Sequence, residues 1–170
     1  MIKGFNAYKK GLVDFAGKKY VLGELYHSDE LVYGKKGFFF YRDLENTLAF
    51  YDGLHEELDI AEVEGYDETC EYLDSYTEAR IVGATDFRIA RIMPREEIIN
   101  YALHLNEISV GKFLAGYRLT EEEMARFDKM GEIVKLYVDY HQRGDKEVFE
   151  RKYGGNAKRI GTITRKPRKG

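Results

Sequence analysis

The segment Lys3-Gly4-Phe5-Asn6-Ala7-Tyr8 near the start of the chain has a near-copy further on, Lys36-Gly37-Phe38-Phe39-Phe40-Tyr41. Each copy places a glycine directly ahead of aromatic side chains, and in the first copy these alternate with small or polar residues. Such patterns are typical of buried or half-buried strands. We therefore predict strands at residues 2–8 and 38–41, with two short extended runs between residues 19 and 27.

More strand-like sequence follows the second copy. Residues 59–64 alternate acidic with apolar side chains, which indicates another strand. Two β-rich runs, 76–82 and 87–93, flank Gly83-Ala84-Thr85-Asp86, and this spacing predicts a hairpin with a four-residue loop. The acidic stretch 65–75 is compatible with a loop or with a short helix.

Helix signals appear inside and after the strand-rich part. Asp43 is a candidate N-cap for a helix that Asp52-Gly53 would end. Pro94 suits the first turn of a second helix, which we expect to run to about His104. A short connection containing Gly111 is predicted after it.

The clearest helix begins at Thr120-Glu121-Glu122-Glu123, a capping box in which the threonine and the third glutamate satisfy each other's backbone. An apolar stripe continues this helix to His141, and we expect one face of it to pack on the sheet. Its second half is apolar on more than one face, which leaves both a monomer and a homodimer open. A last short helix is predicted at 145–153.

These elements predict an α+β fold with a β-rich N-terminal half and an α-helical C-terminal half. We expect a β-rich core at 1–105 with one inserted helix and a helical extension packed on it at 106–155. Residues 156–170 are predicted to form a disordered basic tail.

The composition is that of a globular protein. The chain has 170 residues, 44% of them apolar, and it contains 14 tyrosines, 10 phenylalanines and no tryptophan. A single cysteine, Cys70, excludes an internal disulfide. The first residues lack the apolar core of a signal peptide, and no apolar run approaches the length of a membrane helix. We therefore expect a cytoplasmic protein with no membrane contact.

The small net charge of −3 hides a strong asymmetry along the chain. Ten acidic residues and no basic one lie between residues 56 and 79, whereas the last thirteen residues contain six basic residues and no acidic one. Such asymmetry concerns partners and solubility rather than the fold. The acids of this run are Glu56, Glu57, Asp59, Glu62, Glu64, Asp67, Glu68, Glu71, Asp74 and Glu78.

The sequence contains no recognised arrangement of catalytic or metal-binding residues. None of the four histidines has a second histidine or a cysteine at metal-ligand spacing. The glycines do not form a phosphate-binding loop or a dinucleotide fingerprint, and acidic neighbours oppose thiolate formation at Cys70. The sequence therefore favours binding over catalysis, and it predicts no catalytic residue, no metal site and no cofactor.

The acidic run is the strongest candidate for a functional surface. One interpretation is a solvated edge strand and loop that charge keeps soluble. The other is a surface that imitates the phosphates of a nucleic acid, with tyrosines supplying contact area among the acids. The residues predicted to bind a partner are Glu62, Glu64, Tyr66, Asp67, Glu68, Glu71, Tyr72 and Asp74.

About the first 105 residues resemble a family of uncharacterised phage and prophage proteins. The two Lys-Gly-Phe segments carry the resemblance, together with Asp43-Leu44, Ala61-Glu62-Val63-Glu64-Gly65 and the run 88–93. The resemblance implies a mobile-element origin and no particular activity. Joined to the acidic run, it leads us to expect a phage accessory protein that binds a host protein. The acidic surface would then occupy a basic, nucleic-acid-binding site of that host protein, for example one used in defence against phage.

A second resemblance suggests an alternative. The Gly-aromatic strand and the helix after it, residues 37–49, are similar to the NAD-binding core of the ADP-ribosyltransferase fold. This likeness implies an enzyme or pseudo-enzyme with an NAD pocket between Tyr8, Phe38 and Tyr41. Glu96 or Glu97 would then stand where that fold carries its catalytic glutamate.

The basic tail, residues 158–170, has three interpretations. It is a disordered solvated end, a sequence-independent contact for nucleic acid phosphates, or a segment that folds back on the acidic run and competes with its partner.

Overall fold

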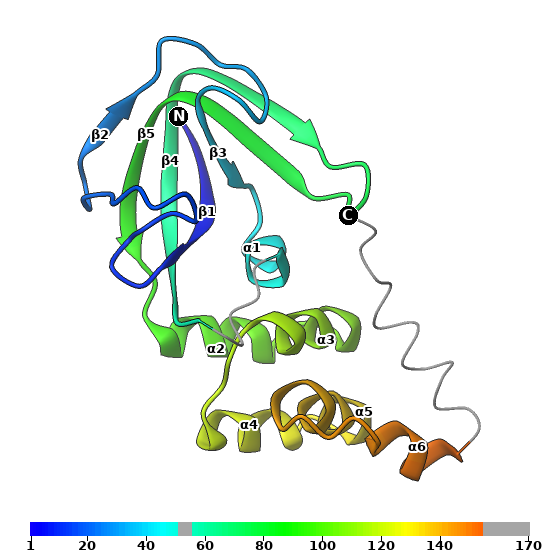
Figure 1. Ribbon diagram of the computed structural model, residues 1–170. Helices are drawn as coiled ribbons and strands as arrows, with labels where there is room; N and C mark the ends of the chain where they lie inside the picture. The colour runs from blue at the N-terminus through cyan, green and yellow to red at the C-terminus, as the bar shows by residue number, and fades with distance from the viewer. Residues whose placement is uncertain (51–55, 155–170) are drawn as a thin grey trace.

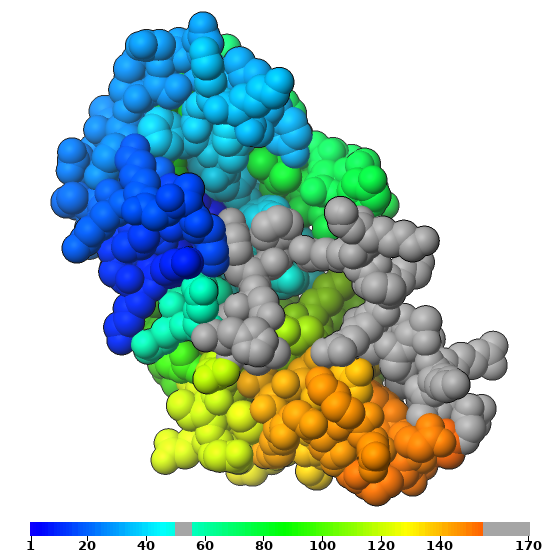
Figure 2. All heavy atoms as spheres, viewed as in Figure 1, coloured from blue at the N-terminus to red at the C-terminus, as the bar shows by residue number. Residues whose placement is uncertain are grey.

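The computed structural model describes residues 1–50 and 56–154. Strands form the upper part of the molecule and helices α2 to α6 the lower part (Figure 1). The space-filling view shows the same stacking of a strand-rich half on a helical half (Figure 2). The α+β fold class, with strands concentrated in the N-terminal half and helices in the C-terminal half, is confirmed.

Four antiparallel strands form a closed ring. Strand β1 (Ile2–Lys9) pairs with β4 (Leu58–Leu73), and β4 pairs with β5 (Arg80–Ile92). The ring continues from β5 to β3 (Phe38–Tyr41) and closes where Phe5 of β1 meets Tyr41 of β3. The short strand β2 (Leu25–His27) pairs with residues 86–88 of β5, on the same edge as β3 and beyond its start. The two copies of the Lys-Gly-Phe segment thus become the two strands that close the barrel.

Close backbone approach explains the glycine of the first copy. A Cβ on Gly4 would lie 2.3 Å from the carbonyl oxygen of Tyr41 and 2.5 Å from the ring of Phe40. Gly65 of β4 is similarly confined, because its Cβ would lie 2.8 Å from the Cβ of Ala84. Both positions allow the strands to bend tightly around one small core. That core consists of Tyr8, Leu12, Phe40, Ala61, Val63, Val82, Ala84, Phe87 and Ile89.

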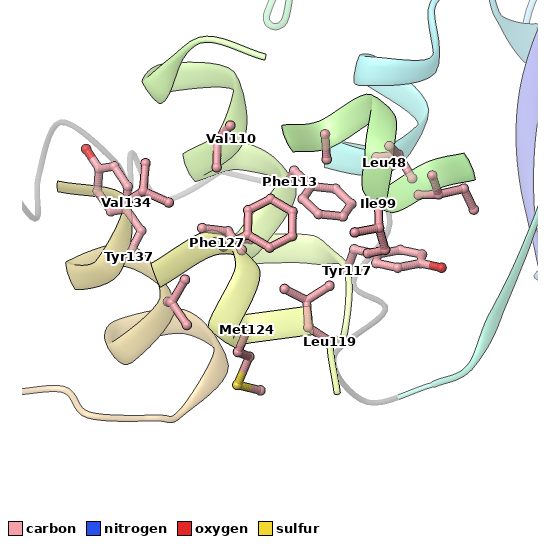
Figure 3. Close-up of a cluster of buried hydrophobic side chains, with 14 of the residues drawn as sticks. Leu48, Ile99, Val110, Phe113, Tyr117, Leu119, Met124, Phe127, Val134 and Tyr137 are labelled. Carbon is pink, nitrogen blue, oxygen red and sulfur yellow. The ribbon is translucent and has the colours of Figure 1, made fainter. Parts of the chain in front are cut away.

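The helical half has a second and larger core. Helix α1 (Leu44–Phe50) lies against the barrel, and α2 (Arg95–Leu103) and α3 (Glu107–Gly116) form the next layer (Figure 1). Below them lie α4 (Glu121–Asp128), α5 (Glu132–Tyr137) with the π-helical turn η1 (Val138–Gln142), and α6 (Val148–Tyr153). Figure 3 shows how Phe113 and Phe127 meet at the centre of this core. Ala7 and Ile60 extend the core to the outside of the barrel.

Several local predictions are confirmed. Thr120 and Glu123 form the predicted capping box at the start of α4. Pro94 precedes α2, and α1 begins at Leu44 directly after Asp43. The predicted end of α1 at Asp52-Gly53 and the predicted behaviour of the tail lie outside the described residues.

The predicted hairpin loop at 83–86 is wrong, because β5 runs without interruption from Arg80 to Ile92. The residues there are small because others pack over them: a Cβ on Gly83 would lie 2.9 Å from the ring of Phe39. The stretch 65–75 is neither loop nor helix, since β4 continues to Leu73. The real turn of the hairpin lies at 74–79.

The helical half also differs from expectation. The predicted connection around Gly111 is the helix α3, most of whose residues are buried. The predicted long helix breaks at Gly131, where φ is +145°, into α4 and α5. These helices pack on α3 and on each other, not on the sheet as expected.

Candidate functional site

The β4–β5 hairpin contains all eight residues predicted to bind a partner. Its register slips between Tyr66 and Thr69, where Asp67 adopts a φ of +62°. This bulge divides the hairpin into a proximal part, residues 58–66 with 86–92, and a distal part, residues 67–85. In the proximal hairpin β4 pairs with β1, whereas in the distal hairpin β4 bends away from β1 and leads to the turn, while the β5 half still pairs with β3 (Figure 1).

The two glutamates of the proximal hairpin that were predicted to bind a partner, Glu62 and Glu64, are neutralised by arginines of the opposite strand. Arg91 of β5 contacts both carboxylate oxygens of Glu62, at 3.0 and 2.9 Å, and also contacts Glu97 of α2 at 2.6 Å. The hydrogen bonds from Arg91 lower the pKa of Glu97. Because Arg91 joins β4 to α2, Glu62 is committed to the contact between the barrel and the helices.

Glu64 is even more firmly engaged, and only 7% of it is exposed. Arg88 donates to its Oε1 atom at 2.6 and 3.1 Å and to the hydroxyl of Tyr66 at 3.1 Å. These hydrogen bonds outweigh the cost of burial and lower the pKa of Glu64. Glu62, Glu64 and Tyr66 therefore face their own arginines and are not a free acidic surface.

Replacing Arg88 by methionine should make stability depend on pH in a new way. The pKa of Glu64 is lower in the native protein than in the unfolded chain, so its ion pair stabilises the native protein at pH values above the ordinary glutamate pKa. This stabilisation disappears as the pH falls through the lowered pKa of Glu64 in the native protein. In Arg88→Met the carboxylate stays mostly buried without its partner, which disfavours the charged form. We expect a lower Tm than wild type at pH 7 and a difference that shrinks toward about pH 3 as the carboxyl protonates.

Thermal unfolding monitored by circular dichroism across this pH range measures the effect. The variant Arg88→Met/Glu64→Gln removes the buried charge and is the control, since it should recover part of the lost Tm at pH 7. A Tm difference between Arg88→Met and wild type that stays constant with pH would contradict the assignment of the effect to Glu64.

Two exposed acids distinguish the distal hairpin from the proximal one. Asp67 and Glu68 are exposed, and neither has an ion-pair partner among the described residues. Glu71 lies 3.6 Å from the guanidinium of Arg42, a long and half-exposed contact. Asp74 shapes the turn, since its Oδ1 accepts the backbone N–H groups of residues 76 and 77 at 2.8 and 3.0 Å.

Aromatic and apolar side chains accompany these acids. Tyr72 packs against Tyr33, with ring centroids 4.3 Å apart, and both lie beside Phe39. A hydrogen bond with the Cys70 thiol raises the pKa of Tyr72. Beyond them, Leu73 is 69% exposed and Tyr76 at the turn is 94% exposed. Such large exposed side chains are typical of interaction surfaces when they gather in one place.

The alternation of a strand distributes these residues over two faces. Glu71 is paired with Val82, and Tyr72 with Ile81, so the two side chains point to opposite sides of the hairpin. What they share is an edge. Distal β4 pairs with β5 on one side, and among the described strands none pairs with residues 66–73 on the other. The predicted residues of the distal hairpin therefore surround an open strand edge and do not form one flat face.

Two surface hollows lie in the described part of the chain, and most of their charged side chains already have ion-pair partners. In the first, of about 320 Å³, Arg42, Asp43, Glu62 and Glu97 all have ion-pair partners. It is lined by Phe5, Arg42, Asp43, Leu44, Glu62, Met93, Glu97 and Tyr101. In the second, of about 440 Å³, Arg95 binds Glu123. Its walls are Glu56, Glu57, Leu58, Arg95, Tyr117, Arg118, Leu119 and Thr120.

The residues of the suggested NAD pocket do not line an open cavity. Tyr8 and Tyr41 are only 1% and 7% exposed, and Phe38 stacks flat on Phe87 with centroids 5.2 Å apart. Neither hollow includes any of the three. Glu96 is paired with Arg126 and Glu97 with Arg91. Two of the three side chains that the alternative assigns to NAD binding are therefore buried in the barrel, and the third packs on Phe87.

Sequence analysis missed the residues that decide which acids are free. Arg88 and Arg91 were treated only as part of a strand, although an arginine opposite an acid on a neighbouring strand is the usual means of neutralising it. Tyr33 was missed because it lies in a loop with no pattern of its own. Leu73 lies in a stretch that is compatible with a loop or with a short helix. The sequence therefore does not indicate which way its side chain faces.

Within residues 1–50 and 56–154 no group of three or more His, Cys, Asp or Glu side chains is arranged to hold a metal ion. The helices of this part of the chain are also too short or too polar to cross a membrane. Comparison of the sequence with protein-family models, with curated proteins and with solved structures finds no match.

Proposed function

We propose that the protein acts by binding, and that the distal hairpin is the element that docks on a basic surface of another protein. In this proposal the partner is a host protein whose basic surface ordinarily binds nucleic acid, and the chain is a phage accessory protein that occupies it. The observation that carries the proposal is the open, acidic edge of distal β4, flanked by exposed Leu73 and Tyr76.

Charge supports this choice of surface. Glu62 and Glu64 already have arginine partners, so a second basic partner would gain little from them. Asp67 and Glu68 have no such partner among the described residues, and they lie where the register slips. A concentration of unpaired carboxylates raises the association rate with a basic protein, and salt screens the effect.

Shape and chemistry support it as well. Aromatic side chains contribute much of the binding energy at protein interfaces, and Tyr72 and Tyr33 form a ready-packed pair beside the acids. An open strand edge also offers backbone N–H and C=O groups to an extended segment of a partner. The alternative interpretation, in which the acids only protect the edge from aggregation, explains the charges but not the exposure of Leu73 and Tyr76.

The proposal predicts that Glu68→Lys/Glu71→Lys abolishes partner binding without unfolding the protein. Glu68 and Glu71 are exposed and can be replaced without disturbing the backbone. Asp67 and Asp74 are left unchanged, because Asp67 has a left-handed backbone and Asp74 holds the turn. The immobilised wild-type protein is exposed to host-cell extract, and retained proteins are then challenged with duplex DNA. We expect retained proteins that DNA displaces, and at least a tenfold loss of them with the variant.

The matched control is Glu122→Lys/Glu150→Lys, which makes the same change of charge at exposed helical positions far from the hairpin. It should retain the partners like wild type. Equal retention by the distal variant, or retained proteins that duplex DNA fails to displace, would overturn the proposal. Retention should also fall steeply above about 0.15 M salt, where the Debye length is about 8 Å.

A further inference from the structure

A lysine of this chain lies inside a cage of aromatic rings beside strand β2. The Nζ atom of Lys18 is 4.9 Å from the ring centroid of Tyr20, 4.9 Å from that of Tyr26 and 5.7 Å from that of Phe38. All three distances are within the range of cation–π attraction. The three rings come from separate segments, namely the loop before β2, strand β2 and the start of β3.

The walls of this cage are held in place by residues behind them. Phe38 stacks on the buried Phe87, and Tyr20 meets Tyr26 edge to face with centroids 5.0 Å apart. The hydroxyl of Tyr26 accepts the backbone N–H of Val21 at 2.9 Å. Burial, helped by the charge of Asp14, raises the pKa of Tyr20 to about 12, so that its ring stays neutral. The cage is therefore preformed and does not depend on Lys18 for its shape.

Lys18 itself is held much less firmly than its cage. It is exposed, and no carboxylate among the described residues lies within 4.0 Å of its ammonium group. By contrast, Lys36 is paired with Glu30 at 2.6 Å and Lys10 with Glu57 at 3.0 Å. The residue before it, Gly17, has a φ of +97° and open space around it. The side chain can therefore leave the cage by its own rotations, without breaking an ion pair.

We propose that the cage is a binding site for a quaternary ammonium group, which Lys18 occupies as an internal substitute. An external trimethylammonium group would enter as Lys18 swings out into solvent. The site uses none of the acidic or exposed residues of the distal hairpin, and it does not depend on the docking proposed there.

A quaternary ammonium group suits these rings better than the lysine does. A primary ammonium has three N–H donors and a tightly held hydration shell, and the faces of three rings can replace little of either. A trimethylammonium group has no N–H, holds water weakly, and presents methyl groups to the rings, which is why aromatic cages bind such ligands. Beside the cage, Val21, whose backbone N–H binds the Tyr26 hydroxyl, is 55% exposed and offers apolar contact to the remainder of a ligand.

The experiment is a titration with tetramethylammonium chloride, followed by NMR of the aromatic side chains. In Lys18→Ala, we expect saturable shifts of the Tyr20, Tyr26 and Phe38 ring signals. The ammonium group of Lys18 competes for the same rings, and an exposed cation–π contact shifts such an equilibrium about 2- to 5-fold, so the wild-type protein should bind about 2- to 5-fold more weakly than Lys18→Ala. Choline and Nε-trimethyl-lysine should compete for the same site.

Two controls isolate the chemistry. The neutral carbon analogue of choline, 3,3-dimethylbutan-1-ol, has the same shape and no charge, and it should bind Lys18→Ala at least about tenfold more weakly than choline. The variant Lys18→Ala/Tyr26→Ala should lose binding, and Lys18→Ala/Tyr26→Phe, which keeps a ring at this position, should retain most of it. Lys35→Ala, at an exposed lysine outside the cage, should behave like wild type.

The proposal is overturned if Lys18→Ala shows no saturable shift, if the neutral analogue binds as well as choline, or if wild type and Lys18→Ala bind equally. The natural source of the group is distinguished by comparing free choline with a peptide that contains trimethyl-lysine. Tighter binding of the peptide than of free trimethyl-lysine would assign the site to a modified protein, and equal binding would assign it to a small molecule.

Discussion

Replacing Phe127 by alanine is expected to lower the free energy of unfolding by about 4 kcal/mol. Phe127 is fully buried at the centre of the helical core, where its ring lies 5.7 Å from that of Phe113 (Figure 3). The substitution removes a whole ring from a site that α3, α4 and α5 surround, so the structure around it cannot collapse fully into the space. Urea unfolding followed by circular dichroism measures the change at constant slope.

The control for this prediction is Ile108→Ala in α3. Ile108 is 73% exposed, so its replacement should change the free energy of unfolding by no more than about 0.5 kcal/mol. A cost below about 1 kcal/mol for Phe127→Ala would mean that the helices do not share the core described here.

Gly4→Ala is the second large effect, with an expected loss of about 3 kcal/mol. The added methyl would lie 2.3 Å from the carbonyl oxygen of Tyr41 and 2.5 Å from the Phe40 ring. The carbonyl oxygen of Tyr41 belongs to the backbone, so no side-chain rotation relieves this clash. Strand β1 must therefore move away from β3. The measurement is again urea unfolding, and the loss of Phe5–Tyr41 contact should appear as accelerated amide exchange in β1 and β3.

Gly111→Ala tests whether the effect comes from strand closure or from any glycine replacement. At Gly111 a Cβ would lie 3.4 Å from the ring of Tyr137, an ordinary contact, and the position is inside helix α3. Alanine should therefore stabilise the protein there, by about 0.5 kcal/mol. Similar losses at both glycines would contradict the steric explanation for Gly4.

Local signals in the sequence were enough for the elements whose ends are chemically marked. Thr120 and Glu123 cap α4, and Pro94 begins α2, because these residues satisfy or avoid backbone groups regardless of the rest of the fold. The aromatic alternation of residues 2–8 also predicted β1 correctly. In each case the deciding interactions lie within one turn or one strand.

Predictions failed where distant neighbours decide the structure. Gly83 looked like part of a loop, but it is small because Phe39, Leu31 and Tyr72 pack across it. Gly111 and Gly116 disfavour a helix because glycine has a low helix propensity. Burial of Val110, Phe113 and Leu114 nevertheless stabilises α3. No window of sequence contains the residues that make these contacts.

The candidate surface was predictable in composition and not in extent. The acidic run and the tyrosines within it both indicate a binding surface on the hairpin. Which acids remain free depends on the pairing of Glu64 with Arg88 and of Glu62 with Arg91, and therefore on the register of two strands. The cage around Lys18 gave no sequence signal, since its three rings meet only after the barrel has closed.

The closed ring of strands also dictates an order of events during protein synthesis. Strand β1 finds most of its partners in residues 58–65, and β3 finds most of its partners in residues 81–84. Until β5 has left the ribosome, β3 lacks its main partner, and chains that stop before Arg80 cannot close the ring. Contacts so far apart in sequence form slowly, and the waiting strands are exposed to aggregation. The barrel therefore folds late during synthesis and as a single unit. The helices that follow it in the chain then pack against a barrel that has already formed.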